Sequence, residues 1–138
     1  CFVQLFEATL ASWCGRPSGI CSMDPTCGNS LVVEPDGDIY TCDHFVGPEH
    51  RLGNLRTTSL EALYEGPERH LFGNRKQSQL PHTCRQCPYL FACQGGCPKQ
   101  RWDRLPDGSY RNYLCEGLQH YFSTVAPYMD ALKKSLHL

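Results

Sequence analysis

The spacing of the cysteines restricts the fold of this chain more than any other feature. The chain has 138 residues and ten cysteines, eight of which fall into two runs. The first run has the spacing C-x5-C-x14-C, and the second has C-x2-C-x5-C-x3-C with one more cysteine after seventeen residues: Cys21, Cys27, Cys42 and Cys84, Cys87, Cys93, Cys97, Cys115. Eight thiolates suit two metal centres, because a tetrahedral zinc ion and a cubane iron–sulfur cluster each take four.

Disulfides are the least favoured explanation of this pattern. Cys84, Cys87, Cys93 and Cys97 would be crowded if they paired locally, and the sequence shows no secretory signal that would indicate an oxidising compartment. Zinc is a stronger alternative. The short spacings Cys84-x2-Cys87 and Cys93-x3-Cys97 would form one closed zinc site and leave a second set for another: Cys21, Cys27, Cys42, Cys115.

The iron–sulfur interpretation depends on the run that ends at Cys97-Pro98. Bacterial ferredoxins contain a C-x2-C-x2-C-x3-C-P run whose last cysteine binds the other cluster. By analogy, Cys97 would join Cys21, Cys27 and Cys42, and the other site would consist of Cys84, Cys87, Cys93 and Cys115. Gly95 and Gly96 would let the backbone turn sharply and direct N–H groups towards sulfur. This pattern favours an iron–sulfur cluster, and zinc stays an alternative.

The predicted secondary structure is sparse. Pro35-Asp36-Gly37-Asp38 separates two β-branched runs and predicts a hairpin over residues 31–41, which would bring Cys27 and Cys42 together. A capping box of Thr58 and Glu61 indicates a short helix. A second short helix is expected over residues 68–72, ending near Gly73.

The remaining segments complete the predicted fold. Residues 84–113 are expected to be loops, and the type of residues 1–13 is ambiguous. Apolar residues at steps of three and four predict a helix from Gly117 to Leu136, kinked or restarted at Pro127. The expected class is therefore a small, irregular, metal-stapled α+β fold, with a hairpin, cluster-binding loops and a C-terminal helix.

Charge and hydropathy exclude two classes of partner. The chain has 13 Lys+Arg against 14 Asp+Glu, which gives no reason to expect a nucleic acid or an anionic membrane surface. No apolar run approaches the ~20 residues of a membrane helix. Cys1 and Cys14 are expected to be ordinary cysteines, and none of the six histidines is placed like a ligand.

Several motifs outside the cysteine spacing resemble one family. They are Cys21-x5-Cys27-Gly28, Val33-Glu34-Pro35-Asp36-Gly37, Tyr40-x-Cys42-Asp43, Pro48-Glu49-His50-x-Leu52-Gly53-Asn54 and Cys93-x-Gly95-Gly96-Cys97-Pro98-Lys99. Together they resemble the C-terminal SPASM domain of anaerobic sulfatase-maturating enzymes, which are radical S-adenosylmethionine (SAM) proteins. The resemblance covers residues 20–130, so we expect residues 20–138 to be the SPASM domain and residues 1–19 to be the end of a radical SAM barrel or a linker.

The resemblance implies a function and a site. Such domains hold two auxiliary [4Fe–4S] clusters, here on Cys21, Cys27, Cys42 and Cys97 and on Cys84, Cys87, Cys93 and Cys115. The family oxidises a Cys or Ser of a sulfatase precursor to formylglycine, in a low-oxygen cytoplasm, and the auxiliary clusters accept an electron. Asp43 would deprotonate the substrate, with a pKa raised by the anionic cluster beside it.

One family motif is missing from this sequence. The radical SAM motif C-x3-C-x2-C does not occur, so SAM and a third [4Fe–4S] cluster would belong to a radical SAM domain of the parent chain. We therefore predict that this chain alone does not oxidise the sulfatase peptide. The alternatives are a zinc-binding structural or interaction module and a SPASM domain of another peptide-modifying radical SAM enzyme.

Overall fold

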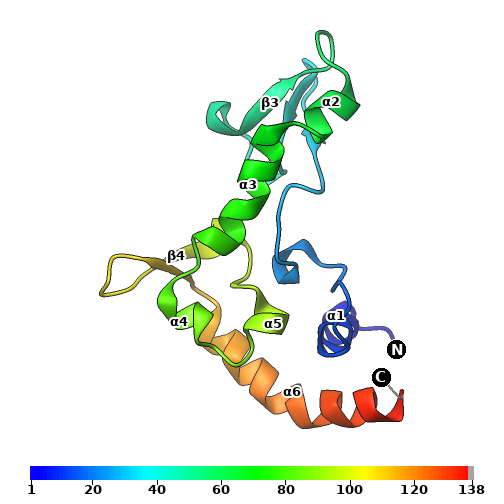
Figure 1. Cartoon of the computed structure of the whole chain (residues 1–138), viewed down its shortest axis with the longest axis vertical. Helices are drawn as coiled ribbons and strands as arrows, with labels where there is room; N and C mark the ends of the chain where they lie inside the picture. The colour runs from blue at the N-terminus through cyan, green and yellow to red at the C-terminus, as the bar shows by residue number, and fades with distance from the viewer. Residues whose placement is uncertain (137–138) are drawn as a thin grey trace. The chain divides into compact units, whose positions relative to one another are not determined.

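The chain divides into two compact units. The computed structural model describes residues 1–136. Unit 1 combines Cys1–Asp24 with Leu80–Leu138, and unit 2 is Pro25–Gln79. Figure 1 shows the path of the chain through both units, which contain helices and short strands. The predicted α+β class is confirmed.

Unit 1 is built mainly from helices. The N-terminal segment, whose type the sequence left ambiguous, forms helix α1, and this helix packs against α5 and α6. Its apolar core gathers Ala8, Trp13, Met23, Ala92, Phe122 and Met129. The elements are α1 (Gln4–Trp13), η1 (Cys21–Met23), α4 (His82–Arg85), α5 (Leu90–Cys93), η3 (Pro98–Gln100), β4 (Arg101–Arg104), β5 (Tyr110–Asn112) and α6 (Cys115–Ser135).

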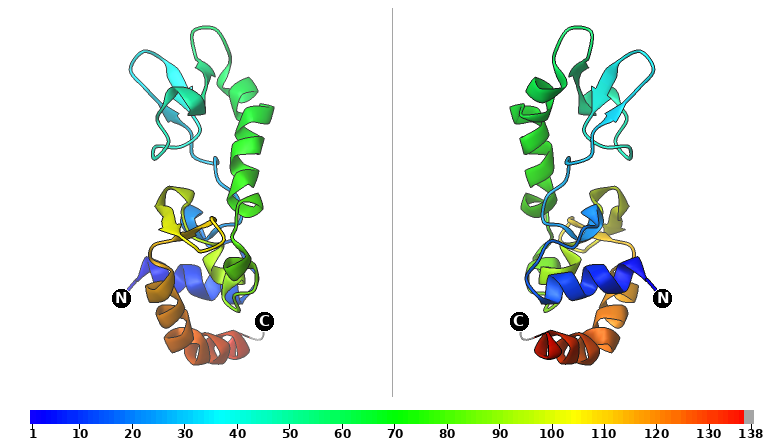
Figure 2. Two further views of the ribbon diagram at one scale, coloured as in Figure 1. Left: turned by 90° about the vertical axis from the view of Figure 1, so that its left-hand side faces the viewer. Right: turned by 90° about the vertical axis from the view of Figure 1, so that its right-hand side faces the viewer.

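The predicted C-terminal helix is confirmed, with a different start. It begins at Cys115, two residues before Gly117, and therefore includes a cysteine of the second run. The helix continues through Pro127 without restarting. Its ribbon bends along its length (Figure 2), as expected where a proline removes one backbone hydrogen bond.

The expectation that residues 84–113 are loops is wrong. Strands β4 and β5 form an antiparallel hairpin in this segment. Its turn, Pro106-Asp107-Gly108, repeats the sequence of the turn that predicted the first hairpin. The Leu105 N–H donates to Ser109 O at 2.9 Å, and Gly108 supplies the positive φ of +83° that the turn requires.

Unit 2 is a small sheet with two helices. The predicted hairpin is confirmed: β1 (Val32–Val33) pairs with β2 (Asp38–Tyr40), Val33 opposite Ile39. The sequence did not predict β3 (Arg51–Asn54), which pairs antiparallel with β2 after η2 (Pro48–His50). Asn54 closes the turn, because its Nδ2 donates to Asp36 O at 3.1 Å and to Asp38 Oδ1 at 2.7 Å.

Two helix boundaries in unit 2 differ from the prediction. Ser59, not Thr58, caps α2 (Leu60–Tyr64), since its hydroxyl accepts from the Ala62 N–H at 3.2 Å. Helix α3 (Pro67–Ser78) continues through Gly73 instead of ending there. A Cβ on Gly73 would lie 2.6 Å from Cys27 O, so this glycine serves a close approach between a helix and a cysteine loop.

Candidate metal centres

Four cysteines of unit 1 line one pocket. Cys84 lies in α4, Cys87 follows it by one tight turn, Cys93 is the last residue of α5, and Cys115 is the first residue of α6. The Cys87 N–H donates to Cys84 O at 3.1 Å, which explains the two-residue spacing. The pocket has a volume of about 440 Å³ including its open mouth. Helix ends therefore supply three of the four thiols.

The glycines after Cys93 wrap the chain around this pocket. Gln94, Gly95 and Gly96 have successive positive φ values of 50°, 71° and 65°. A Cβ on Gly96 would collide with the side-chain amide of Asn112. Burial raises the pKa of Cys93, and the nearby backbone N–H groups of Gly95 and Gly96 lower it by less; the Gly96 N–H also donates to Cys93 O at 2.9 Å.

The four thiols destabilise one another as anions. Burial, and then the charges of Cys115 and Cys93, raise the pKa of Cys84 to about 11. Burial also raises the pKa of Cys115, opposed by the positive charge of Arg111. Four thiolates in one half-buried pocket need a multivalent cationic centre to be stable, so this donor set fits an iron–sulfur cluster or zinc.

Sequence reasoning missed the side chains of α6 that line the same pocket. Gln119 Nε2 lies 3.8 Å from Cys87 Sγ, within the range of a hydrogen bond to sulfur. Leu118 and Phe122 line the pocket with Cys115, at positions i+3 and i+7 of the helix. Their spacing from Cys115 places these residues on the same face of a helix as the cysteine, but the predicted helix began at Gly117 and therefore did not include Cys115.

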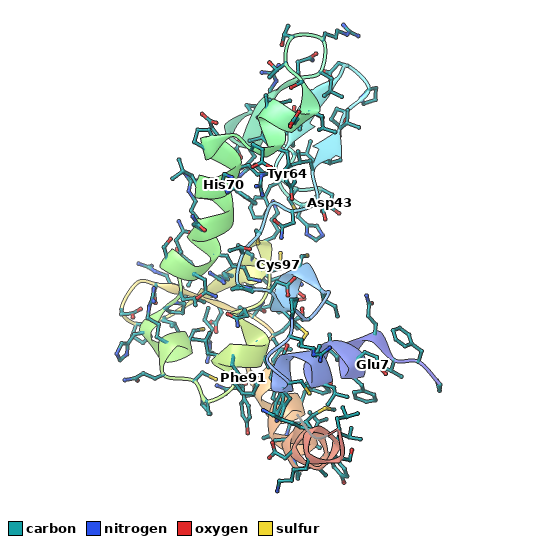
Figure 3. All side chains as sticks on the ribbon, turned by 45° about the vertical axis from the view of Figure 1, so that its right-hand side comes forward. Glu7, Asp43, Tyr64, His70, Phe91 and Cys97 are labelled. Carbon is teal, nitrogen blue, oxygen red and sulfur yellow. The ribbon has the colours of Figure 1, made fainter. Side chains whose placement is uncertain are left out.

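The other four predicted ligands are divided between the units. Cys21 begins η1 and Cys97 precedes η3, both in unit 1 (Figure 3 labels Cys97). Cys27 and Cys42 belong to unit 2. The Cys27 N–H donates to Gly73 O at 3.3 Å, which attaches this cysteine to α3. Unit 2 therefore contributes two cysteines and does not complete a four-thiolate site from its own residues.

Asp43 lies beside Cys42 on the surface of unit 2. The Cys42 Sγ donates to Asp43 Oδ1 at 3.2 Å, and His44 Nδ1 lies 3.9 Å from the same oxygen. The hydrogen bond from Cys42 and then the charge of His44 lower the pKa of Asp43, whereas we expected a raised pKa. The difference has a physical cause: the Cys42 thiol donates a hydrogen bond to the carboxylate, and a thiolate bound to a metal has no proton with which to do so.

His44 is a further residue that sequence reasoning did not place at a site. One ligand atom each from Cys42, Asp43 and His44 lie within 4.8 Å of one another. The three residues are consecutive, and the turn after β2 directs them together. The sequence signal was this adjacency alone, which is common on protein surfaces. The predicted base Asp43 and the predicted ligand Cys42 therefore lie close to the imidazole of His44.

The family comparison defines the class of domain. Residues 21–88 match the SPASM family, an iron–sulfur cluster-binding domain. The chain belongs to this family, and the resemblance found in its motifs is confirmed. Among the described residues, no helix is long and apolar enough to cross a membrane.

The relatives narrow the class to one kind of enzyme. The chain is 48% identical over 136 residues to a serine-type anaerobic sulfatase-maturating enzyme of Bacteroides thetaiotaomicron, covering 98% of this chain and 33% of the relative. It is 29% identical over 125 residues to a cysteine-type enzyme of Clostridium perfringens, covering 91% and 34%.

A solved structure agrees with these relatives. Native anSMEcpe with bound AdoMet and a Cp18Cys peptide superposes with a TM-score of 0.77 at 26% identity, covering 96% of this chain and 36% of that one. The chain is thus a SPASM domain of the anaerobic sulfatase-maturating type. It spans about a third of the length of the curated relatives it matches.

Proposed function

We propose that this chain is the auxiliary-cluster domain of a radical SAM enzyme that oxidises a Cys or Ser of a sulfatase precursor to formylglycine. The observation that carries the proposal is the pocket of unit 1, where Cys84, Cys87, Cys93 and Cys115 meet in a domain of the SPASM family. Relatives of both the serine and the cysteine type support the substrate class. Oxygen-sensitive clusters imply a low-oxygen cytoplasm.

The proposed cofactors are two [4Fe–4S] clusters. One would be held by Cys84, Cys87, Cys93 and Cys115, and the other by Cys21, Cys27, Cys42 and Cys97. When bound, such clusters supply one-electron acceptors. The chain's own residues partly bury the sulfurs of unit 1, and the N–H groups of Gly95 and Gly96 stabilise negative charge on Cys93.

Asp43 is the proposed general base. Its side chain is 73% exposed, so a substrate hydroxyl or thiol can reach the carboxylate and give up a proton to it. The sulfatase precursor peptide is the proposed partner, in line with the peptide in the structure of anSMEcpe. The base and the ligand Cys42 are neighbours in sequence, which would place proton removal beside an electron acceptor.

The test uses the enzyme that also contains the radical SAM domain with the C-x3-C-x2-C motif, where SAM and the third cluster would bind. Asp43→Asn should abolish formylglycine formation in a sulfatase peptide, measured by mass spectrometry, while the iron content stays unchanged. Glu61→Gln, an exposed carboxylate of the same unit, is the control and should retain activity. Full activity of Asp43→Asn would contradict the role of the base.

The isolated chain should show no turnover, because nothing in it carries the radical SAM motif. Formylglycine formed with this chain as the only catalyst would contradict the proposed division of labour. The boundary expected near residue 20 stays a prediction. Helix α1 packs on α5 and α6, so limited proteolysis between residues 14 and 20 tests whether the N-terminal segment separates from unit 1.

A further inference from the structure

Arg69 of α3 is a buried cation next to the loop that carries Cys27. Its residue surface is 7% exposed. The Arg69 Nε donates to Tyr64 O, and Nη1 donates to Gly28 O at 3.3 Å and to Asn29 Oδ1 at 3.4 Å. One guanidinium therefore connects the end of α2 to the two residues after Cys27. Figure 3 labels Tyr64 and His70, the neighbours of this side chain within unit 2.

None of the partners of this guanidinium is a carboxylate. Two are backbone carbonyls, one is a side-chain amide, His70 Nε2 lies 3.3 Å from Arg69 Nη2, and the Tyr64 ring lies 4.0 Å from Arg69 Cζ. Among residues 1–136, no carboxylate forms an ion pair with Arg69. Burying a cation without an anion is costly, so such a position favours negative charge nearby. Cys27 and Arg69 line one pocket of about 360 Å³, so a Cys27 thiolate would supply that charge.

The same face of α3 also contacts Cys27 itself. Gly73 lies four residues after Arg69, on the same side of the helix. Its carbonyl accepts from the Cys27 N–H at 3.3 Å, and the absence of a Cβ permits the contact. Between these two attachments, Gly28 has a φ of +80°, and a Cβ there would lie 3.4 Å from Arg69 Cγ. The loop is therefore fixed on both sides of the Cys27 side chain.

We propose that Arg69 is the positioning residue of the Cys27 ligand loop. It fixes the Cys27–Asn29 backbone and places a permanent positive charge beside the metal centre that Cys27 binds. The inference rests on the proposed ligand role of Cys27. A fixed positive charge stabilises the more negative, reduced form of a cluster, so Arg69 raises the reduction potential of one cluster and makes it the better electron acceptor.

The positioning part is tested by hydrogen exchange of the backbone at residues 26–29, measured by mass spectrometry on protein prepared without oxygen. Arg69→Met should exchange about tenfold faster there, because a hydrogen-bonded clamp is lost. Arg75→Met is the matched control, since Arg75 is an exposed arginine on the same helix. Unchanged exchange in Arg69→Met would overturn the positioning role. This readout needs no assumption about which metal is bound.

The charge part is tested by redox titration of the clusters, followed by electron paramagnetic resonance. In Arg69→Met, one cluster should shift to a lower potential and the other should not. Arg69→Lys keeps the charge but cannot bridge Tyr64 O and Gly28 O, so it should retain the potential while exchange at residues 26–29 rises. Equal potentials in the wild type and Arg69→Met would overturn the charge role. Zinc in place of iron in the wild type would instead contradict the proposed function and leave the exchange result standing.

Discussion

The two units of this chain hold their cysteines in different ways. Unit 1 carries four cysteines around one pocket, three of them at helix ends, and unit 2 carries only Cys27 and Cys42, on loops fixed by α3 and the hairpin. Unit 1 can therefore close a metal site from its own residues, and unit 2 cannot. The difference shows that four of the cysteines line one pocket within a single unit, whereas the two cysteines of unit 2 do not form such a set within theirs.

The two hairpins show the same contrast on a smaller scale. Each has a Pro-Asp-Gly turn and one strand with a cross-strand ion pair of 2.6 Å. In unit 2, Asp38 of β2 pairs with Arg51 of the neighbouring strand β3, and in unit 1, Asp103 of β4 pairs with Arg111 of β5. Only Arg111 also acts on a predicted ligand, since it lowers the pKa of Cys115 against the larger effect of burial. A common motif is thus structural in one unit and adjacent to a candidate metal site in the other.

Paired cysteine variants should have the largest effect, because they test which ligands belong together. Cys97→Ala with Cys115→Ala should remove nearly all iron, since the two cysteines are assigned to different clusters. Cys93→Ala with Cys115→Ala should remove about half, since both belong to the set of unit 1. Iron and sulfide analysis after anaerobic preparation measures both. If half of the iron remained in the Cys97/Cys115 double variant, both cysteines would belong to the same cluster, and the assignment of Cys97 to the cluster of Cys21, Cys27 and Cys42 would be wrong.

Single cysteine variants come next. Cys115→Ala should lose about four iron atoms per chain, with half of the absorbance near 400 nm, because each cubane cluster contains four iron atoms. Cys14→Ala, a cysteine of the same unit outside both sets, should lose none. Iron loss in Cys14→Ala equal to that in Cys115→Ala would break the distinction between ligand and ordinary cysteines.

Glycine variants compare how the two units approach their cysteines. Gly96→Ala should lower the free energy of unfolding by about 3 kcal/mol, because of its positive φ and the collision with Asn112. Gly73→Ala should lower it by about 2 kcal/mol, because the clash with Cys27 O exceeds the gain in helix propensity. A Cβ on Gly117 would have no atom within 4 Å, so Gly117→Ala should not lower the free energy of unfolding. Urea unfolding under anaerobic conditions measures all three variants. Equal unfolding midpoints in the three would contradict the close contacts at Gly96 and Gly73.

The smallest effects should separate the two arginines of these ion pairs. Arg51→Met and Arg111→Met should each lower the thermal midpoint only slightly, since ion pairs that are partly open to solvent contribute little. Arg111→Met should also lower the reduction potential of one cluster, because it removes positive charge near Cys115, whereas Arg51→Met should leave both potentials unchanged. A shift of equal size in both variants would contradict the assignment of Cys115 to the site of unit 1.

Local sequence signals predicted the parts of the fold that depend on local structure. The Pro35–Asp38 turn predicted the first hairpin, and apolar periodicity predicted α6. The identical turn at Pro106-Asp107-Gly108 is an equal signal for a hairpin, but the cysteine-rich segment around it predicts loops. Gly73 predicts a helix end, because a glycine that breaks a helix and one that permits a close contact look the same in a sequence.

The candidate site was predicted less completely than the ligands that form it. Cysteine spacing pointed to metal binding, and the motifs pointed to the family that the comparisons confirm. Arg69, Arg111 and Gln119 left no such signal, because their roles depend on which backbone groups and sulfurs the fold brings near them. Long-range contacts of this kind join residues up to 41 positions apart, as between Arg69 and Gly28, and no local pattern encodes them.

The most direct test of the account is the content of iron, sulfide and zinc in protein prepared and reconstituted without oxygen. The account predicts about eight iron and eight sulfide per chain, which corresponds to two four-iron clusters. About two zinc ions per chain with negligible iron would contradict it, because two closed tetrahedral sites would then replace the electron acceptors.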